Sequence, residues 1–180
     1  MDKKIYLIRH CQAEGQPPES KLTTAGIKQA DELADFLNPI KVDRIISSPF
    51  LRAVETIRPY AERANIEIET DGRLGERVLS TSLMPDWFEK LKMTFSDRDL
   101  KYEGGESSNE AMQRIVEVVN EMIASNGESM IIVTHGNILS LLLSYFSESF
   151  GFAEWQQLSN PDVFLLHIKN NGVHIERKWE

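Results

Sequence analysis

The chain has 180 residues, of which 41% are hydrophobic, and this length suits one domain with a sizeable core. We therefore expect a single domain over residues 1–180. The formal net charge of −8 excludes the broad basic face that a nucleic-acid partner needs, and no stretch approaches the ~20 apolar residues of a membrane span, so we expect neither a nucleic-acid nor a membrane partner. The first residues lead straight into a short strand rather than a signal-peptide core, and the single Cys11 cannot form an internal disulfide. We expect a cytoplasmic protein.

The first part of the chain alternates predicted strands with amphipathic helices. An apolar strand over 5–8 is followed by a loop to residue 21 and by a helix whose apolar positions recur from Ile27 to Leu37. A second strand over 43–46 leads to Ser48-Pro49, the pattern of an N-cap followed by proline at the first helical position. Residues 66–69 alternate like a half-exposed strand.

The second part contains one irregular excursion and then returns to the same alternation. Residues 71–105 are irregular, with one amphipathic piece around Trp87, Leu91 and Phe95. A long helix over 107–124, a strand over 130–134 and a helix over 137–146 follow, and the turn Asn170-Asn171-Gly172 joins two late strands as a hairpin. We expect an α/β fold, a three-layer sandwich with a mostly parallel central sheet and helices on both faces.

Two histidines stand where predicted buried strands end. His10 follows the first strand, and His135 follows the strand over 130–134. Because open α/β sheets bind ligands outside the carboxyl ends of their strands, the two histidines can meet at one site. Arg9 and Arg52 also lie near element ends, and two guanidinium groups with two imidazoles suit a bound oxyanion. The alternatives are surface ion pairs for the arginines and purely structural roles for the histidines.

Six blocks of the chain together resemble the histidine phosphatase superfamily, the phosphoglycerate mutase-like proteins. The resemblance spans about residues 4 to 146, in the order of the family, and rests on Leu7–His10, Leu22–Gly26 with Gln29-Ala30, Ser47–Thr56, Leu74–Glu76, Gly104–Ser107 and Val133–Gly136. It implies that His10 is phosphorylated, that Arg9, Arg52 and His135 hold the phosphoryl group, and that Glu76 protonates the leaving oxygen. No cofactor and no metal ion are implied.

The chemistry of the residues agrees with that resemblance. A neutral imidazole is nucleophilic near pH 7, and positioned cations stabilise the charge on the transferred phosphoryl oxygens. A poor alkoxide leaving group needs a proton, which a carboxylic acid such as Glu76 can give. Some members of the family carry aspartate directly after the second histidine, where this chain has Gly136, which favours Glu76. The alternative for Glu76 is a solvated carboxylate paired with Arg73 or Arg77.

The chain departs from the family pattern beside the first histidine. Cys11 replaces the usual glycine, which leaves altered backbone approach and sensitivity to oxidation as open hypotheses. A cysteine-phosphatase mechanism is not expected, because Pro17 stands where its loop needs arginine. The usual asparagine is also missing, and Gln16 is a candidate for its role. The candidate phosphate-binding residues are Arg9, His10, Gln16, Arg52, His135 and Gly136.

Several other residues are interpreted as structural rather than functional. Glu106-Ser107 favour capping of the long helix over substrate contact, and His167 and His174 match no metal motif. Ordinary packing is the first interpretation of Met84, Trp87, Phe88 and Trp155, and an apolar wall over the site is the second.

Three functions follow from the sequence. We expect a metal-independent phosphatase that hydrolyses a small phosphomonoester through a phosphohistidine on His10. The alternatives are phosphoglycerate mutase-type transfer, for which the segment from Glu76 to Gly105 looks too short to enclose a substrate, and a binding protein for a phosphorylated ligand without turnover. The sequence leaves the particular phosphomonoester and the oligomeric state open.

Overall fold

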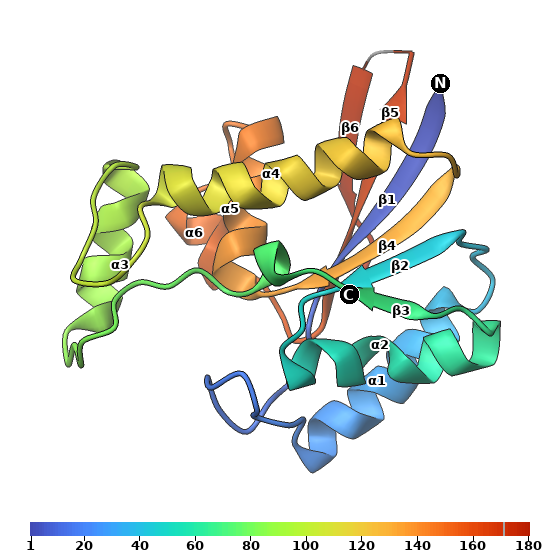
Figure 1. Ribbon diagram of the computed structural model, residues 1–180, viewed down its shortest axis with the longest axis horizontal. Helices are drawn as coiled ribbons and strands as arrows, with labels where there is room; N and C mark the ends of the chain where they lie inside the picture. The colour runs from blue at the N-terminus through green and yellow to red at the C-terminus, as the bar shows by residue number, and fades with distance from the viewer. Residues whose placement is uncertain (171) are drawn as a thin grey trace.

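A six-stranded sheet forms the centre of the computed structural model, which describes residues 1–170 and 172–180 (Figure 1). The strand order is β3-β2-β4-β1-β5-β6. The strands are β1 (Asp2–Arg9), β2 (Arg44–Ser47), β3 (Ile68–Thr70), β4 (Ser129–Thr134), β5 (Asp162–Lys169) and β6 (Gly172–Arg177). The helices are α1 (Thr24–Leu37), α2 (Leu51–Ala64), η1 (Gly72–Leu74), α3 (Trp87–Ser96), α4 (Ser108–Ala124), α5 (Gly136–Phe146) and α6 (Phe152–Gln156).

The first four strands in spatial order, β3, β2, β4 and β1, pair in parallel, whereas β5 and β6 pair antiparallel. The inner strands β1 and β4 are continuous apolar runs because helices cover both of their faces. The two strands lie in register, with Arg9 opposite Thr134, so their carboxyl ends stop at the same edge. The expected mostly parallel sheet is confirmed.

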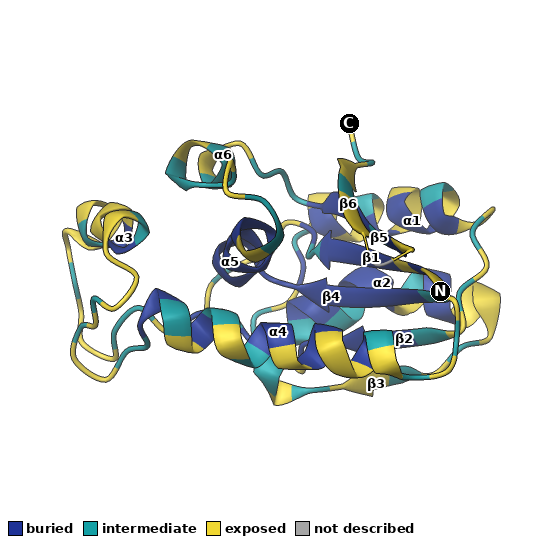
Figure 2. Ribbon diagram, turned by 90° about the horizontal axis from the view of Figure 1, so that it is seen from above, coloured by how far each residue is buried: buried dark blue, intermediate teal, exposed yellow. Residues whose placement is uncertain are grey.

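Two apolar cores lie on opposite faces of the sheet, which confirms the three layers (Figure 1). On one face α1 and α2 pack through residues such as Leu33 and Ile57. On the other face α4 and α5 pack through residues such as Ile115 and Leu139. Helix α5 is buried almost throughout, whereas α3 is mostly exposed and lies beyond the carboxyl ends of β1 and β4 (Figures 1 and 2).

Local expectations fail at three places. The predicted N-cap at Ser48 is wrong, because α2 begins at Leu51 with Phe50 as its N-cap. The strand predicted over 66–69 lies at Ile68–Thr70. The short helix α6 was not expected.

Other local expectations hold. Ser107 caps α4 in a capping box with Glu110, and the amphipathic piece around Leu91 is α3. β5 and β6 form the expected hairpin, although Asn171 of its predicted turn lies outside the described residues. Among the residues that the structure describes, no helix has the length and apolarity needed to cross a membrane.

Lys3 ties β1 to the end of α4. Its side chain is 8% exposed, and Nζ donates to the backbone carbonyl oxygens of Met122 and Ser125. A cation at these free carbonyls satisfies the C-terminus of a helix. We expect Lys3→Met to lower the free energy of unfolding by about 1–3 kcal/mol in urea denaturation. The exposed neighbour Lys4, changed to Met, is the control, and equal losses in both variants would contradict this role of Lys3.

Candidate active site

The ends of β1, β4 and α2 bring two imidazoles and a guanidinium together. His10 follows β1 directly, and His135 follows β4 as the N-cap of α5. Their ring centroids are 5.1 Å apart. Arg52 lies in the first turn of α2, is 1% exposed, and donates from Nε to His10 Nε2 over 3.3 Å. The two histidines, which are far apart in the sequence, therefore meet at one place in the fold.

Backbone contacts fix the orientation of His10. Its Nδ1 donates to the carbonyl oxygen of Cys11 over 2.6 Å. Its backbone N–H donates to the carbonyl oxygen of Thr134 over 3.1 Å. The side-chain amide of Asn160 donates to the His10 carbonyl oxygen over 2.9 Å. With the proton held on Nδ1, the lone pair of His10 lies on Nε2, the atom that faces Arg52.

Both imidazoles are held in the neutral form. Burial lowers the pKa of His10 from 6.5 to about 4, and the nearby charges of Arg52 and Arg9 act in the same direction. Burial also lowers the pKa of His135 well below 6.5, with His10 and Arg52 as further causes. Nε2 of His10 is therefore not protonated at neutral pH, and its lone pair accepts from Arg52.

The lowered pKa of His10 makes stability depend on pH. Because the folded pKa of about 4 is below the ordinary 6.5, the unfolded chain takes up the proton first as the pH falls. Neutral His10 contributes its full stabilisation above pH 6.5. As the pH falls from 6.5 to about 4, the free energy of unfolding decreases by about 3 kcal/mol in all. We expect His10→Gln to show a flatter decline in urea stability across this range than the wild type does. Parallel declines would contradict the assignment.

Neither candidate arginine forms an ion pair within residues 1–170 and 172–180, so the surface ion-pair alternative is wrong for both. Arg52 donates from Nη1 to the carbonyl oxygens of Gln16 and Pro17, at 2.9 and 3.0 Å. Arg9 donates from Nη1 to the carbonyl oxygen of Leu158 over 3.1 Å, and its buried Nε has no hydrogen-bond partner among the residues that the structure describes. Burial lowers the pKa of both guanidinium groups. They are cations whose charge an arriving anion would balance.

Glu76 lies against the N-terminus of α5. Its Oε2 accepts from the backbone N–H of Asn137 over 3.0 Å, and its Oε1 accepts from Ile138 over 3.0 Å and from Arg77 over 2.8 Å. The carboxylate has no side-chain salt bridge to Arg77 or to Arg73, which binds Asp71 and Glu121 instead. The solvated-pair alternative is therefore wrong, and Glu76 is held rigidly between backbone donors.

Gly136 and Gln16 contribute to the site in different ways. A Cβ atom on Gly136 would lie only 2.8–2.9 Å from the Nε, Cζ and Nη2 atoms of Arg9, so glycine leaves room for that guanidinium. Gln16 is exposed, and its backbone carbonyl oxygen, rather than its side chain, contacts Arg52. The side chain of Gln16 lines the adjacent cavity.

Ser48 is a site residue that the sequence interpretation missed. Its hydroxyl shares a 2.8 Å hydrogen bond with His135 Nε2, and it accepts from the backbone N–H of Phe50 over 3.2 Å. The phenyl ring of Phe50 packs edge-on against the ring of His135, with 4.7 Å between centroids. The pair Ser48-Pro49 carried a signal, but the signal was assigned to helix capping rather than to histidine orientation.

The side chain of Cys11 lies in a small apolar cluster. Its side chain is buried with Leu22 and Ala30, and its backbone N–H donates to Thr56 Oγ1 over 2.9 Å. Burial raises the pKa of the thiol to about 12, so the reactive thiolate is scarce at neutral pH. This burial disfavours the hypothesis that Cys11 makes the site sensitive to oxidation.

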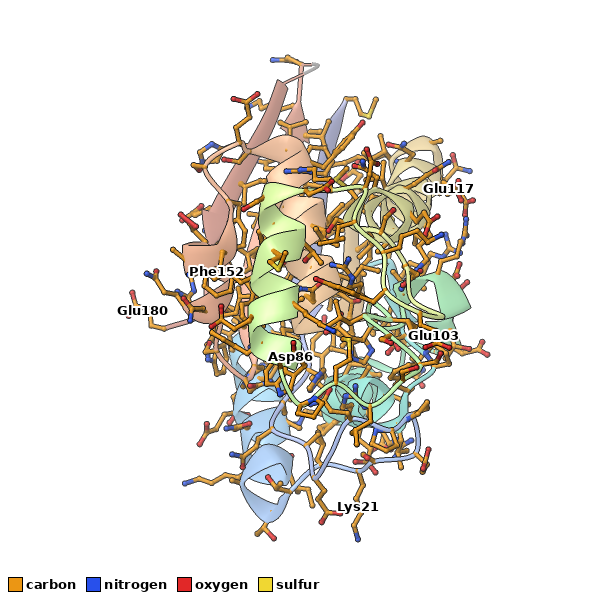
Figure 3. All side chains as sticks on the ribbon, turned by 90° about the vertical axis from the view of Figure 1, so that its left-hand side faces the viewer. Lys21, Asp86, Glu103, Glu117, Phe152 and Glu180 are labelled. Atoms are coloured by element: carbon orange, nitrogen blue, oxygen red, sulfur yellow. The ribbon has the colours of Figure 1, made fainter. Side chains whose placement is uncertain are left out.

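A cavity of about 560 Å³ adjoins the histidine and arginine cluster. Its polar lining includes Arg9, Gln16 and Glu76, and its apolar lining includes Trp87 and Trp155. Of the four residues for which an apolar wall is the second interpretation, these two tryptophans line the cavity, whereas Met84 and Phe88 do not. Figure 3 looks onto this end of the molecule, where Phe152 at the start of α6 lies beside α3.

The titratable side chains at this edge do not form a cluster of metal-ligating groups. Within the described ranges 1–170 and 172–180, no three His, Cys, Asp or Glu side chains are grouped so that they could hold a metal ion. The arrangement instead presents Arg52 and two neutral imidazoles in contact with one another, next to a cavity that Arg9 and the carboxylate of Glu76 line. Such a set suits the binding and transfer of a phosphoryl group.

Comparisons with known proteins show which family and which fold the chain shares. A model of the histidine phosphatase superfamily (branch 1) matches residues 5–179. A probable phosphatase of Schizosaccharomyces pombe is 27% identical over 160 residues, covering 83% of this chain and 76% of that protein. A probable phosphoglycerate mutase of Proteus mirabilis is 28% identical over 196 residues, covering 96% and 91%. The native structure of a mycobacterial glucosyl-3-phosphoglycerate phosphatase has the same fold, with a TM-score of 0.79 at 21% identity over 99% of this chain and 98% of that chain.

Proposed function

Since the chain belongs to the histidine phosphatase superfamily (branch 1), we propose that it hydrolyses small phosphomonoesters through a phosphohistidine on His10, without a metal ion. The observation that carries this proposal is the contact of the neutral His10 with Arg52, beside a cavity that Arg9 and the carboxylate of Glu76 line. Relatives named as phosphatases support the same reaction class.

In the first step His10 Nε2 attacks phosphorus. The N–P bond forms while the bond from phosphorus to the alcohol oxygen breaks, and the Glu76 carboxyl gives its proton to that oxygen. The proton on Nδ1 of His10 stays on that nitrogen, hydrogen-bonded to the Cys11 carbonyl oxygen, so the imidazole needs no other base. Arg9, Arg52 and His135 line the place where charge collects on the phosphoryl oxygens.

In the second step water attacks the phosphorylated imidazole. Glu76, now a carboxylate, takes the proton from water, the N–P bond breaks, and inorganic phosphate leaves with His10 neutral again. The three backbone N–H donors around Glu76 suit its ionised form in this step.

Mutase-type transfer is the second candidate, because relatives named as phosphoglycerate mutases match the chain. A mutase must keep water from the phosphohistidine while the substrate turns around. Here Trp87, which lines the cavity, is 51% exposed to solvent. This openness favours hydrolysis over return of the phosphoryl group to a second hydroxyl.

The decisive experiment follows 4-nitrophenyl phosphate in the presence and absence of a chelator. We expect unchanged turnover with chelator and an acid-labile, base-stable phosphoprotein in rapid-quench samples. Turnover that chelator abolishes would overturn the metal-free mechanism. Rapid interconversion of 3- and 2-phosphoglycerate would favour the mutase, and phosphate binding without any turnover would favour a ligand-binding protein.

Replacing Arg52 tests the role of its guanidinium. Arg52→Lys keeps a positive charge but loses the planar fork that contacts His10 and the Gln16 and Pro17 carbonyl oxygens. We expect kcat/KM for 4-nitrophenyl phosphate to fall by roughly 10²–10³-fold. Arg44→Lys, at a surface ion pair with Glu69, is the matched control. A loss no larger than that of the control would contradict the role of Arg52.

A further inference from the structure

The cavity beside His10 joins a phosphoryl-binding end to an apolar end. Its polar residues include Arg9 at the end of β1, Glu76 in the segment after η1, and Asn137 at the N-terminus of α5. Its apolar residues come from α3, α6 and the segment before α3, and they are Leu79, Trp87, Leu91 and Trp155. A phosphomonoester bound with phosphorus at His10 therefore directs its alcohol group along two indole rings.

Contacts among aromatic side chains fix the shape of the apolar end of the cavity. The indole of Trp155 packs against three phenyl rings, those of Phe152, Phe95 and Phe88, with centroids 5.7, 6.1 and 6.4 Å away. These contacts join α3 to α6, so the wall has a fixed shape (Figure 3). Trp87 contacts Phe88 at 5.7 Å and otherwise leaves half of its surface open at the rim. A flat ring entering the cavity would cover that open surface.

Arg77 also lines the cavity, and its two Nη groups are already engaged in hydrogen bonds. Arg77 is buried, and its Nη1 donates to Thr94 Oγ1 over 3.2 Å and to Ser108 Oγ over 3.1 Å. Its Nη2 donates to the Glu106 carbonyl oxygen over 3.0 Å. Among the described residues, the buried lining donors without a partner are Nε of Arg9, Nε of Arg77 and Nδ2 of Asn137. The side chains of Leu79 and Leu91 at the apolar end offer no donor, so a carboxylate placed against that end would lose its water without gaining a charged partner. The volume of about 560 Å³ also lies within the about 300–1,000 Å³ of cavities that hold whole small molecules.

We propose that this cavity selects phosphomonoesters whose alcohol group is an uncharged aromatic ring, bound against Trp87 and Trp155. The proposal rests on the proposed function for the position of the phosphoryl group, and it adds the chemical class of the leaving group. Small carboxylated alcohols, such as those of phosphoglycerates, would leave both indoles uncovered. Aromatic contacts and buried ring area together supply the preference.

The test measures binding without turnover, by calorimetric titration with three phosphonates that cannot be hydrolysed. Benzylphosphonate carries the ring, methylphosphonate lacks it, and phosphonoacetate carries a carboxylate in its place. We expect benzylphosphonate to bind roughly tenfold more tightly than methylphosphonate. Equal affinities, or tighter binding of phosphonoacetate than of benzylphosphonate, would overturn the proposal.

Variants of Trp87 test whether the aromatic side chains cause the preference for benzylphosphonate. Trp87→Ala is expected to remove most of the benzyl preference and to leave methylphosphonate binding unchanged, whereas Trp87→Phe keeps a ring and restores part of the preference. Tyr145→Ala is the matched control, because Tyr145 is an aromatic residue of similar exposure, 53%, at the far end of α5. An unchanged preference in Trp87→Ala would sink the proposal. Absence of turnover on 4-nitrophenyl phosphate would instead count against the proposed function, so the two failures are distinguishable.

Discussion

Replacing His10 with alanine is expected to abolish phosphomonoester hydrolysis, with kcat/KM falling by a factor on the order of 10⁵. No neighbouring group can substitute as the nucleophile. The thiol of Cys11 is buried with a pKa raised to about 12, and His135 Nε2 is already hydrogen-bonded to Ser48. The same variant should form no acid-labile phosphoprotein in rapid-quench samples.

A second histidine provides the control for this change. His174 is exposed on β6, far from the carboxyl ends of β1 and β4, so His174→Ala should keep full turnover and full phosphoprotein. Stability measured at neutral pH separates loss of chemistry from loss of fold in His10→Ala. Residual activity of His10→Ala above about 1% of wild type, with a phosphoprotein still present, would show that another residue is phosphorylated.

Glu76→Gln is expected to slow hydrolysis in a way that depends on the leaving group. For benzyl phosphate, whose alkoxide needs a proton to leave, the expected loss in kcat is about 10²–10⁴-fold. For 4-nitrophenyl phosphate the phenolate leaves without a proton, so the initial burst of nitrophenolate should remain. Single-turnover measurements on both substrates give the two rates directly.

The control for Glu76→Gln must reproduce its structural role. Glu76 accepts from backbone N–H groups at the start of α5, and Glu110 does the same at the start of α4 through the N–H of Ser107. Glu110→Gln should therefore weaken a helix N-terminus without changing the chemistry. Equal losses on the two substrates in Glu76→Gln would show that Glu76 acts by holding α5 rather than by transferring a proton.

The sequence predicts the sheet and the meeting of the histidines well because the signal is local and strong. Residues 5–8 and 130–134 are continuous apolar runs, and parallel strands buried on both faces need such runs. Once both are placed in one parallel sheet, the residues after them share an edge. The proximity of His10 and His135 follows from this register.

The sequence fails where contacts between distant segments decide the outcome. Ser48 followed by Pro49 has the local pattern of a helix start, yet the Ser48 hydroxyl bonds to His135, far along the chain. The surroundings of Glu76 depend on backbone N–H groups of residues 137 and 138, which no local pattern relates to it. Helix α6, with five residues, is too short to show an apolar period.

The buried position of Cys11 gives the protein a built-in reporter of local opening. Its thiol is buried with Leu22 and Ala30, and Cys11 directly follows, in the chain, the residue that we propose is phosphorylated. A thiol-specific reagent can reach it only when the loop after β1 separates from α1, so the labelling rate measures the frequency of that opening. Because Cys11 is the one cysteine of the chain, each modified molecule carries its label at this place. Motion next to the reacting imidazole can thus be timed by mass spectrometry in the unaltered protein.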